Sequence, residues 1–375
     1  MTVFFNSICF LGKSAAGAFR RLALVLPFFL ILWPARGAEI PLLLHWNHQS
    51  QFAGYYVAAE KGFYRKRGRD AVIRRGGSDI DQAALLAGTN PVFCTTMLFT
   101  ALACRDKGVP VIHLAQVVNR PNFCLVAWKN RGISRPEDLG GRKVSFWIGA
   151  FEAPYRDFFK RYRLAPLVEP QYYSVNLFLR GGVDACAAMY YNEYHTLLQC
   201  GVDPEDLTVF KTWEHGFDCP EDGIYCTAQT AADPAMCHDI VEASLEGWQY
   251  ARDHREEALD IVMGYVRRDH VPTNRAHMQW MLDKMLDSIF PGPGDRWRFG
   301  VLERESYDRA VALLRGQAQI KSAPAFDDFH PPSFACGVTT EGRPSSSFAC
   351  GVTTEGRPSP SFVCGVTTEV SGVSH

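Results

Sequence analysis

The chain has 375 residues, 47% of them hydrophobic and 21% charged, and a formal net charge of −1. These values exclude a disordered chain, a collagen and a small disulfide-bonded scaffold, and the length is enough for one large domain or two lobes. A charge near zero also argues against a broad nucleic-acid-binding surface, so we expect no nucleic-acid partner.

The first segment has the pattern of an export signal. Basic residues precede an apolar run from Leu22 to Trp33, which is short for a membrane-spanning helix. The small residues Ala35 and Gly37 fit a cleavage site after Gly37. We therefore predict a signal peptide over 1–37 and a periplasmic mature protein; the alternative is an uncleaved anchor.

Strands and helices alternate from Ile40 onward. Apolar runs bounded by Gly, Pro and polar residues predict strands, and longer segments closed by Gly predict helices. The predicted elements are strands 40–44, 71–73, 91–94 and 109–118, with helices 52–64, 79–87 and 97–107 between them. This order predicts an open α/β sheet whose ligands bind beyond the carboxyl ends of the strands.

After a further predicted strand at 123–128, a second unit of the same kind begins near residue 129. Its predicted elements are strands 143–148, 171–174 and 183–189, and helical segments 134–139, 155–162 and 176–180. From Asp233 onward the pattern becomes helical, with helices predicted at 235–254, 255–266, 274–286 and 303–315. Two comparable units would place their strand ends opposite each other across a cleft.

The far end is a tandem repeat. A unit rich in Gly, Ser, Thr and Pro starts at Ser333, recurs at Ser347 and continues as a variant at Ser361, with a period of 14 residues. Such a unit has too few large apolar side chains to form a core. We predict a disordered tail over 331–375.

Eight cysteines lie between the predicted signal peptide and the tail, an even number that permits disulfides in an oxidising compartment. Cys94, Cys124 and Cys186 lie in apolar strand-like runs and are expected to be buried thiols. Cys219 with Cys226 is the pair that we would test first for a local bridge. No Cys-x-x-Cys pair or His-x-x-His spacing indicates a metal site, so no metal ion is expected.

Several short motifs resemble those of ABC-importer solute-binding proteins. The similar branch contains SsuA-like proteins, bacterial binding proteins for thiamine pyrimidine precursors, and the eukaryotic thiamine pyrimidine synthases. The order and spacing of the motifs carry the resemblance over about residues 40–320; they are Leu44-His45-Trp46-Asn47, the segment 54–64, Gly108-Val109-Pro110-Val111, the segment 133–144, and Gly182-Val183-Asp184-Ala185.

The resemblance implies a two-lobed, type II periplasmic-binding-protein fold with a hinge. The expected organisation is lobe 1 over 38–128, lobe 2 over 129–215, and a return to lobe 1 over 216–330 with C-terminal helices. It implies a small heterocycle, such as a thiamine pyrimidine precursor, trapped by hinge closure. The expected partners are an ABC permease and its ATPase, with membrane contact only through the permease.

Aromatic residues are candidates to contact a flat ligand in the first unit. Trp46, beside Asn47, follows a strand and has an indole ring that stacks on heterocycles; the alternative is packing under the loop. Tyr55 and Tyr56 are adjacent at the start of a helix, so one is expected to face the cleft and the other to pack. Thr95 and Thr96 end the strand that precedes the next helix.

Glu193 is the strongest candidate in the second unit. It follows a strand that should end at the cleft, and a carboxylate accepts paired hydrogen bonds from an aminopyrimidine amine and a protonated ring nitrogen. In the resembling family a Glu lies at the matching position. The alternative is a solvated charge. Asn192 is expected either to orient Glu193 or to cap the following helix.

Two further positions complete the predicted site. Gly149 precedes a helix start whose backbone N–H groups could hold an anion, but Glu152 in the same segment opposes a phosphate. We therefore expect an unphosphorylated ligand. Asp222 lies where the chain is expected to return to the first unit.

The rival function is that of the synthase itself. The resemblance implies a catalytic Lys and His, but the matching positions hold Thr96 and Thr100. It also implies a dense cysteine motif, where this chain has only Cys226. We therefore predict a binding protein without a cofactor rather than an enzyme. A periplasmic sensor module is the third possibility considered.

Overall fold

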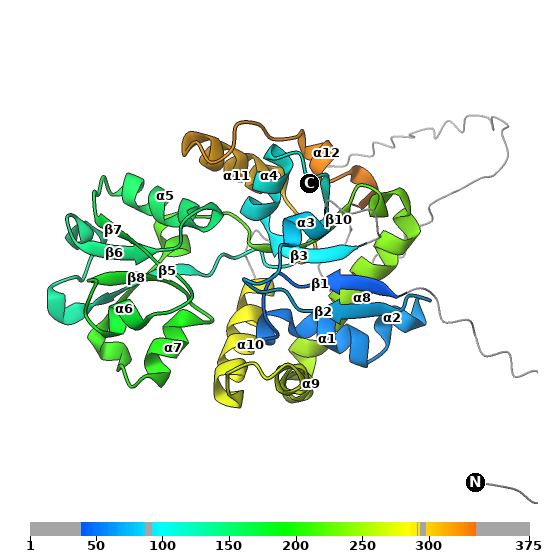
Figure 1. Ribbon diagram of the computed structural model, residues 1–375, viewed down its shortest axis with the longest axis horizontal. Helices are drawn as coiled ribbons and strands as arrows, with labels where there is room; N and C mark the ends of the chain where they lie inside the picture. Colours follow the sequence, from blue (N-terminus) through cyan, green and yellow to red (C-terminus); the bar gives the residue numbers. More distant parts are fainter. Residues whose placement is uncertain (1–38, 87–91, 291, 293–297, 335–375) are drawn as a thin grey trace, which may run out of the picture. The chain divides into compact units, whose positions relative to one another are not determined.

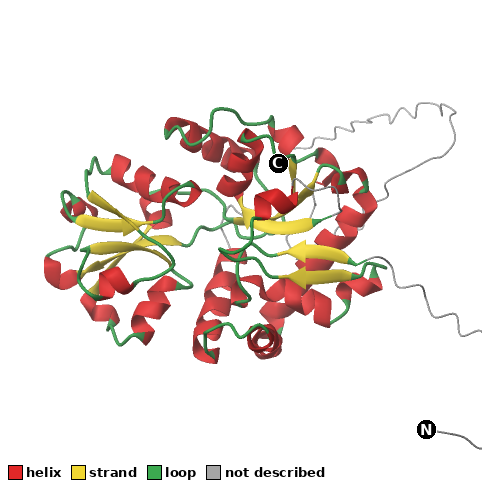
Figure 2. Cartoon of the chain, viewed as in Figure 1, coloured by secondary structure: helices red, strands yellow, loops and turns green. Residues whose placement is uncertain are grey.

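The computed structural model describes residues 39–86, 92–290, 292 and 298–334. The predicted signal peptide and almost all of the predicted repeat tail lie outside these residues. The α/β class predicted from the sequence is confirmed, because the described residues form two five-stranded sheets with helices on both faces of each (Figures 1 and 2).

The first sheet has the strand order β2-β1-β3-β10-β4. Its strands are β1 (Ile40–Leu43), β2 (Ala71–Arg74), β3 (Phe93–Met97), β4 (Val111–Gln116) and β10 (Asp222–Thr227). Strand β10 is antiparallel to both of its neighbours, whereas β1 is parallel to β2 and β3. The helices that follow these strands are α1 (Ala53–Glu60), α2 (Phe63–Lys66), α3 (Gln82–Leu86) and α4 (Leu98–Asp106).

The second sheet repeats this plan, with the order β7-β6-β8-β5-β9. Its strands are β5 (Phe123–Trp128), β6 (Lys143–Phe146), β7 (Leu167–Pro170), β8 (Ala185–Met189) and β9 (Leu207–Lys211). Strand β5 is antiparallel to β8 and β9. The accompanying helices are α5 (Ala153–Arg161), α6 (Asn176–Leu179) and α7 (Glu193–Gln199). In each sheet the antiparallel strand is the first one that the chain forms after crossing from the other sheet: β10 in the first sheet and β5 in the second.

The two connections between the sheets run beside each other. Strand β4 leads into β5 through residues 117–122, and β9 leads back to β10 through residues 212–221. The backbone N–H of Glu221 donates to the Val118 carbonyl at 2.9 Å, and the Val118 N–H donates to the Asp222 carbonyl at 2.9 Å. These paired segments are where a hinge between the sheets would bend.

The chain after β10 is helical, as predicted. The helices are α8 (Pro234–Asp253), α9 (Arg255–Arg268), α10 (Arg275–Ile289), α11 (Arg304–Gly316) and α12 (Phe326–Phe329). Helix α8 packs across α1, and α9 packs on both α1 and α10. Within the described residues, no helix is both long and apolar enough to cross a membrane.

Several details differ from the prediction. Strand β7 occupies Leu167–Pro170 rather than 171–174, and strand β9 and helix α7 were not predicted. The predicted helix 52–64 is divided because Gly62 adopts φ +73°, a left-handed conformation that ends α1. The thiol beside Cys226 is that of Cys237, not Cys219, and the described cysteines are free.

Candidate functional site

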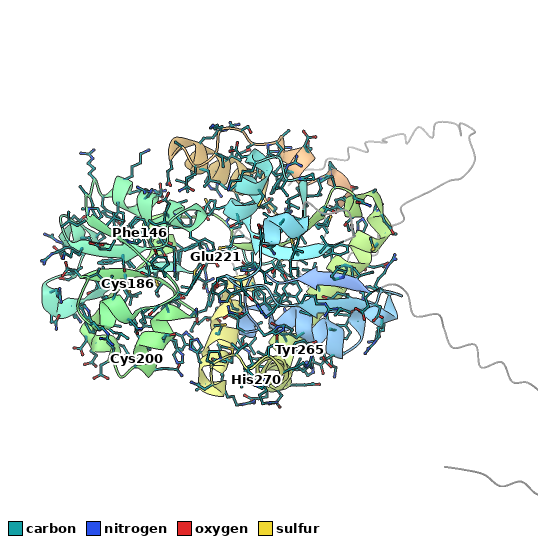
Figure 3. The ribbon with its side chains drawn as sticks, in the orientation of Figure 1. Phe146, Cys186, Cys200, Glu221, Tyr265 and His270 are labelled. Carbon is teal, nitrogen blue, oxygen red and sulfur yellow. The ribbon has the colours of Figure 1, made fainter. Side chains whose placement is uncertain are left out.

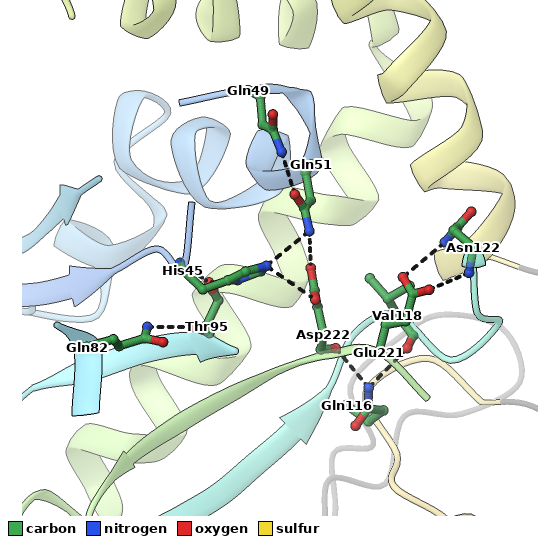
Figure 4. A network of polar contacts seen from close by, with 10 residues as sticks. All are labelled: His45, Gln49, Gln51, Gln82, Thr95, Gln116, Val118, Asn122, Glu221 and Asp222. Carbon is green, nitrogen blue, oxygen red and sulfur yellow. Dashed lines mark hydrogen bonds and ion pairs between the residues drawn. The ribbon is translucent and has the colours of Figure 1, made fainter. Parts of the chain in front are cut away.

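A polar network joins three strand ends of the first sheet (Figure 4). His45 follows β1, and its Nδ1 lies 2.9 Å from the hydroxyl of Thr95 on β3. Its Nε2 lies 3.6 Å from Oδ1 of Asp222, the first residue of β10. Gln51 donates from Nε2 to Asp222 Oδ2 at 2.8 Å. The predicted site residues Thr95 and Asp222 are therefore brought together around one imidazole.

Burial controls the charges in this network. It raises the pKa of Asp222, although His45 and a hydrogen bond from Gln51 oppose the shift. Burial also lowers the pKa of His45, although the nearby Asp222 charge opposes that shift. Near pH 7 the imidazole is therefore mainly neutral, and the network has a carboxyl group without a fully charged counter-ion.

Glu221 lies beside Asp222 but belongs to the connection between the sheets (Figures 3 and 4). Its carboxylate accepts a short hydrogen bond from the Asn122 backbone N–H and another, at 3.3 Å, from Asn122 Nδ2. Asn122 in turn accepts from the Ser288 hydroxyl of α10 at 2.9 Å. Burial, followed by repulsion from Asp222, raises the pKa of Glu221 to about 8.

Glu193 is the first residue of α7, directly after the turn that follows β8. Its carboxylate accepts from the Met189 backbone N–H at 2.8 Å and from Asn192 Nδ2 at 2.8 Å. Burial raises its pKa, and these hydrogen bonds oppose the shift. Asn192 thus orients Glu193, which is one of the two roles expected for it from the sequence. Each carboxylate oxygen still has a lone pair that can accept from another donor.

A directional chain of hydrogen bonds continues from Glu193 to α10. Because Asn192 Nδ2 donates to the carboxylate, Asn192 Oδ1 accepts from His277 Nε2 at 2.9 Å. His277 Nδ1 then has no proton and accepts from His195 Nδ1, also at 2.9 Å. Burial and the neighbouring His195 lower the pKa of His277 to about 4, so both rings are neutral near pH 7.

The half-buried Trp46, which follows β1, meets an exposed aromatic ring that follows β7 of the second sheet. The indole ring is 4.9 Å from the ring of Tyr173, centroid to centroid, with 46° between the planes. Tyr173 is 66% exposed and its neighbour Tyr172 is 76% exposed. Exposure of adjacent large rings is unusual in a folded chain and is typical of a binding surface. Asn47, half-buried, lies in the same loop as Trp46.

Tyr55 and Tyr56 are both fully buried. The Tyr55 ring packs edge-on against Trp248 of α8, with the centroids 5.8 Å apart, and Tyr56 stacks on Tyr265 of α9 at 4.3 Å. The Tyr56 hydroxyl lies 2.9 Å from His48 Nδ1. These contacts give both rings a packing role, and a ligand contact by either remains a prediction.

The other predicted positions are spread over both sheets. Thr96 is buried in β3 opposite Gly223 of β10. Gly149 has φ +90° and is exposed just before α5. Glu152 near it forms an ion pair with Arg156 at 2.7 Å, so its charge is partly compensated. Among the described residues, no three His, Cys, Asp or Glu side chains are placed to hold a metal ion.

Two tyrosines that we did not predict have pKa values raised partly by the charges of the acidic side chains. Tyr191, 3% exposed, has a pKa raised by burial and then by Glu221, Asp222 and Glu193 in turn. Tyr155 of α5 is fully buried, and its hydroxyl has no hydrogen-bond partner among the described residues. The sequence signal was present for Tyr191, which stands two residues before Glu193.

Comparison with known proteins identifies a family and relatives of the chain. The family model described as NMT1/THI5 like matches residues 49–258. A 4-amino-5-hydroxymethyl-2-methylpyrimidine phosphate synthase of Legionella pneumophila is 24% identical over 242 residues, which are 60% of this chain and 73% of that protein. The riboflavin-binding protein RibY of Chloroflexus aurantiacus is 24% identical over 300 residues, 76% of this chain and 84% of that protein.

The fold has counterparts among solved structures. The periplasmic aliphatic sulphonate binding protein SsuA of Escherichia coli superimposes with a TM-score of 0.59 at 14% identity, covering 87% of this chain and 97% of that chain. At this identity the likeness concerns the fold alone. The predicted two-lobed architecture of periplasmic solute-binding proteins is thereby confirmed.

Proposed function

Because the chain belongs to the NMT1/THI5-like family and has the fold of ABC-importer solute-binding proteins, we propose that it is an extracytoplasmic solute-binding protein that captures a small heterocycle. A thiamine pyrimidine precursor of the formylaminopyrimidine or hydroxymethylpyrimidine class is the proposed ligand. Its partners are an ABC permease and ATPase, and the mature protein acts in the periplasm. The export pattern that ends near Gly37 supports this location.

The observation that carries the proposal is the meeting of Trp46 and Tyr173. The two rings come from different sheets, and their centroids are 4.9 Å apart. The two rings contact each other directly, so a flat ligand would take the place of the Tyr173 ring against Trp46 and leave Tyr173 to close over it from the other sheet. The buried Asp222 and the half-buried Glu193, each at a strand end, supply acceptors that would fix the orientation of such a ring.

The second candidate function is pyrimidine synthesis, which the name of the Legionella relative favours. The two positions expected to hold the catalytic Lys and His are Thr96, which is buried in β3, and Thr100, which is on α4. A threonine forms no Schiff base and has no imidazole to react. The chemistry of these side chains therefore supports capture of the ligand over its synthesis.

The proposal is tested by calorimetric titration with 4-amino-5-hydroxymethyl-2-methylpyrimidine. We expect one site per chain. Trp46→Ala should weaken binding at least tenfold, about 1.4 kcal/mol, because a stacking surface is lost, and Trp46→Phe should recover most of it. The melting temperature without ligand serves as a folding control. Equal affinities for the Ala, Phe and unaltered proteins would refute the role of Trp46, and absence of heat with any heterocycle would refute the function.

A further inference from the structure

We infer that Tyr173 lies on a fixed aromatic arm, and that Gln171 and Trp147 are the positioning residues that hold this arm in place. The arm consists of residues 172–174, which follow Gln171 at the end of β7. The inference rests on the proposed function, because it says what directs the Tyr173 ring at Trp46. It concerns side-chain hydrogen bonds in the second sheet that strand pairing alone does not explain.

Gln171 anchors the near end of the arm to the sheet. Its backbone N–H donates to the Phe146 carbonyl at 2.9 Å, which continues the pairing of β7 with β6. Its side chain reaches the backbone of Ala187 on β8, where Nε2 donates to the carbonyl at 2.8 Å and Oε1 accepts from the N–H at 3.1 Å. The Ser145 hydroxyl donates to the same Oε1 at 2.9 Å. Both polar atoms of this buried side chain are therefore hydrogen-bonded within the sheet.

The Gln171 amide takes the place of a strand residue. Strand β6 ends at Phe146, whereas its neighbour β8 continues further. The register pairs Ser145 with Cys186, so the next position on β8 is Ala187. The amide of Gln171 supplies the two hydrogen bonds of that position, and a buried backbone left without them would be destabilised. The start of the arm is therefore held as firmly as a residue of the sheet.

Trp147 holds the first residue of the arm. Its indole Nε1–H donates to the Tyr172 carbonyl at 3.0 Å, across 25 residues of sequence. The Trp147 ring packs against the rings of Phe151 and Tyr155, with the centroids 6.3 Å and 6.1 Å apart. Tyr155 of α5 is fully buried. The donor that restrains the arm is therefore itself packed against the interior.

The far end of the arm is anchored as well. Val175 is buried in an apolar cluster of the second sheet, together with Phe178 of α6. The Asn176 backbone N–H donates to the Ser174 hydroxyl at 3.1 Å, where the arm leads into α6. Only three residues lie between the two anchors, so the backbone at Tyr173 has little freedom relative to the sheet. An exposed ring on a restrained backbone is preorganised for a contact outside its own sheet.

The fixed arm determines how Trp46 becomes accessible. The Tyr173 ring lies 4.9 Å from the Trp46 ring, centroid to centroid. Because the backbone of the arm is held, the rings separate when the sheets move apart at their connections or when the Tyr173 side chain rotates. The restraints lie within the second sheet, so they are kept during either movement. Gln171 and Trp147 would thus raise the affinity by reducing the conformational entropy lost on binding.

A double-mutant cycle tests the arm in the binding reaction. The probe is 4-amino-5-hydroxymethyl-2-methylpyrimidine, titrated by calorimetry. Trp147→Phe keeps a ring to pack on Tyr155 but has no N–H for the Tyr172 carbonyl, so the affinity should fall roughly three- to tenfold. In a Tyr173→Ala background the same substitution should change the affinity by less than about twofold. A role of Trp147 in folding alone would give equal effects in the two backgrounds.

Thr208→Val is the matched control for a lost hydrogen bond. The Thr208 hydroxyl donates to the Ile133 carbonyl at 2.6 Å from β9, at the opposite edge of the same sheet. Valine removes this bond and leaves the arm intact, so the affinity should be unchanged.

Gln171→Met removes both bonds to the Ala187 backbone. It should lower the melting temperature as well as the affinity, and its effect on the affinity should also disappear in the Tyr173→Ala background. If this variant fails to fold, Trp147→Phe alone decides the result.

A second measurement requires no ligand. Incorporation of 3-fluorotyrosine gives a fluorine NMR signal for Tyr173, which is assigned by its loss in Tyr173→Phe. The ring current of Trp46 should displace this signal from its position in the unfolded chain. Trp147→Phe should move the signal back toward that position, because the arm is released, and Thr208→Val should leave it unchanged.

The outcomes separate this inference from the function beneath it. An unmoved fluorine signal in Trp147→Phe, or an affinity loss that persists in the Tyr173→Ala background, would overturn the fixed arm and leave a heterocycle-binding protein. If no heterocycle binds but the fluorine signal moves as expected, the arm stands and the proposed function is wrong.

Discussion

Glu221 illustrates what an acidic site costs the folded chain. The carboxyl group is 1% exposed, and its pKa rises to about 8. The native protein therefore keeps a proton that the unfolded chain releases near its ordinary pKa of 4.5. The stability that this proton contributes is fully present below pH 4.5. Between pH 4.5 and 8 the folded state binds more protons than the unfolded state, so this contribution is lost progressively as the pH rises through 8.

Glu221→Gln should consequently stabilise the ligand-free protein at pH 8, by roughly 2–4 kcal/mol, and have little effect at pH 4.5. Glutamine keeps an oxygen to accept from the Asn122 backbone N–H but has no charge to bury. Urea unfolding at both pH values measures the difference, with Glu305→Gln, at a side chain 88% exposed on α11, as control. The same stabilisation at pH 4.5 and 8 would show that another group titrates. A variant that gains stability while losing affinity would be typical of a functional site.

At the scale of the elements, a close helix crossing positions the loop of the first sheet. A Cβ on Gly54 of α1 would lie 2.3 Å from Cγ of Trp248 on α8, and a Cβ on Gly247 would lie 2.1 Å from the Gly54 carbonyl oxygen. Only glycines allow this approach. Helix α1 directly follows the turn that contains Gln51, so the crossing determines where Gln51 meets Asp222.

Gly54→Ala should therefore destabilise the protein by about 1–3 kcal/mol, or more if α8 has to move, because the methyl group has no space. Gly264→Ala is the matched control, since a Cβ there meets nothing within 4 Å in helix α9. That substitution should be neutral or stabilising by up to about 1 kcal/mol, as alanine is the better helix former. Chemical denaturation compares the two. Similar effects for both substitutions would contradict the packing account.

For the molecule as a whole, α10 connects the site to the segments that join the sheets. His277 near its start reaches Glu193 through Asn192. Ser288 near its end donates to Asn122, which in turn donates to Glu221. Helix α10 is thus linked to Glu193 through the side chain of Asn192 and to Glu221 through the side chain of Asn122. Binding at Glu193 and bending at the connections are therefore expected to be coupled.

Elements whose formation depends on local sequence were predictable, whereas elements that depend on pairing with distant residues were not. Strands β1, β5 and β8 are buried apolar runs and were recognised as such. Strand β7 was displaced in the prediction because Leu167–Pro170 is an exposed edge strand that ends in proline and has no alternating pattern. Local patterns thus located most elements, and missed those whose pairing depends on distant residues.

The site was predictable in part for the same reason. Glu193 and Asp222 follow or begin strands, and strand ends are a sequence-level signal. Tyr55 looked equally well placed, but it is buried by Trp248, which lies nearly two hundred residues later in the chain. Tyr191 was missed although it stands two residues before Glu193, because the effect of Glu221 on it comes from a different connection. Tertiary contacts of this kind have no counterpart in local sequence.

The central claim, capture of an intact small heterocycle without chemistry, is tested most directly by native mass spectrometry. The protein is incubated with 4-amino-5-hydroxymethyl-2-methylpyrimidine and then analysed whole and after denaturation. We predict a complex heavier by one ligand mass, and release of that ligand with its mass unchanged from a chain of unchanged mass. A chemically altered ligand, a histidine lost from the chain, or no bound mass would contradict the account.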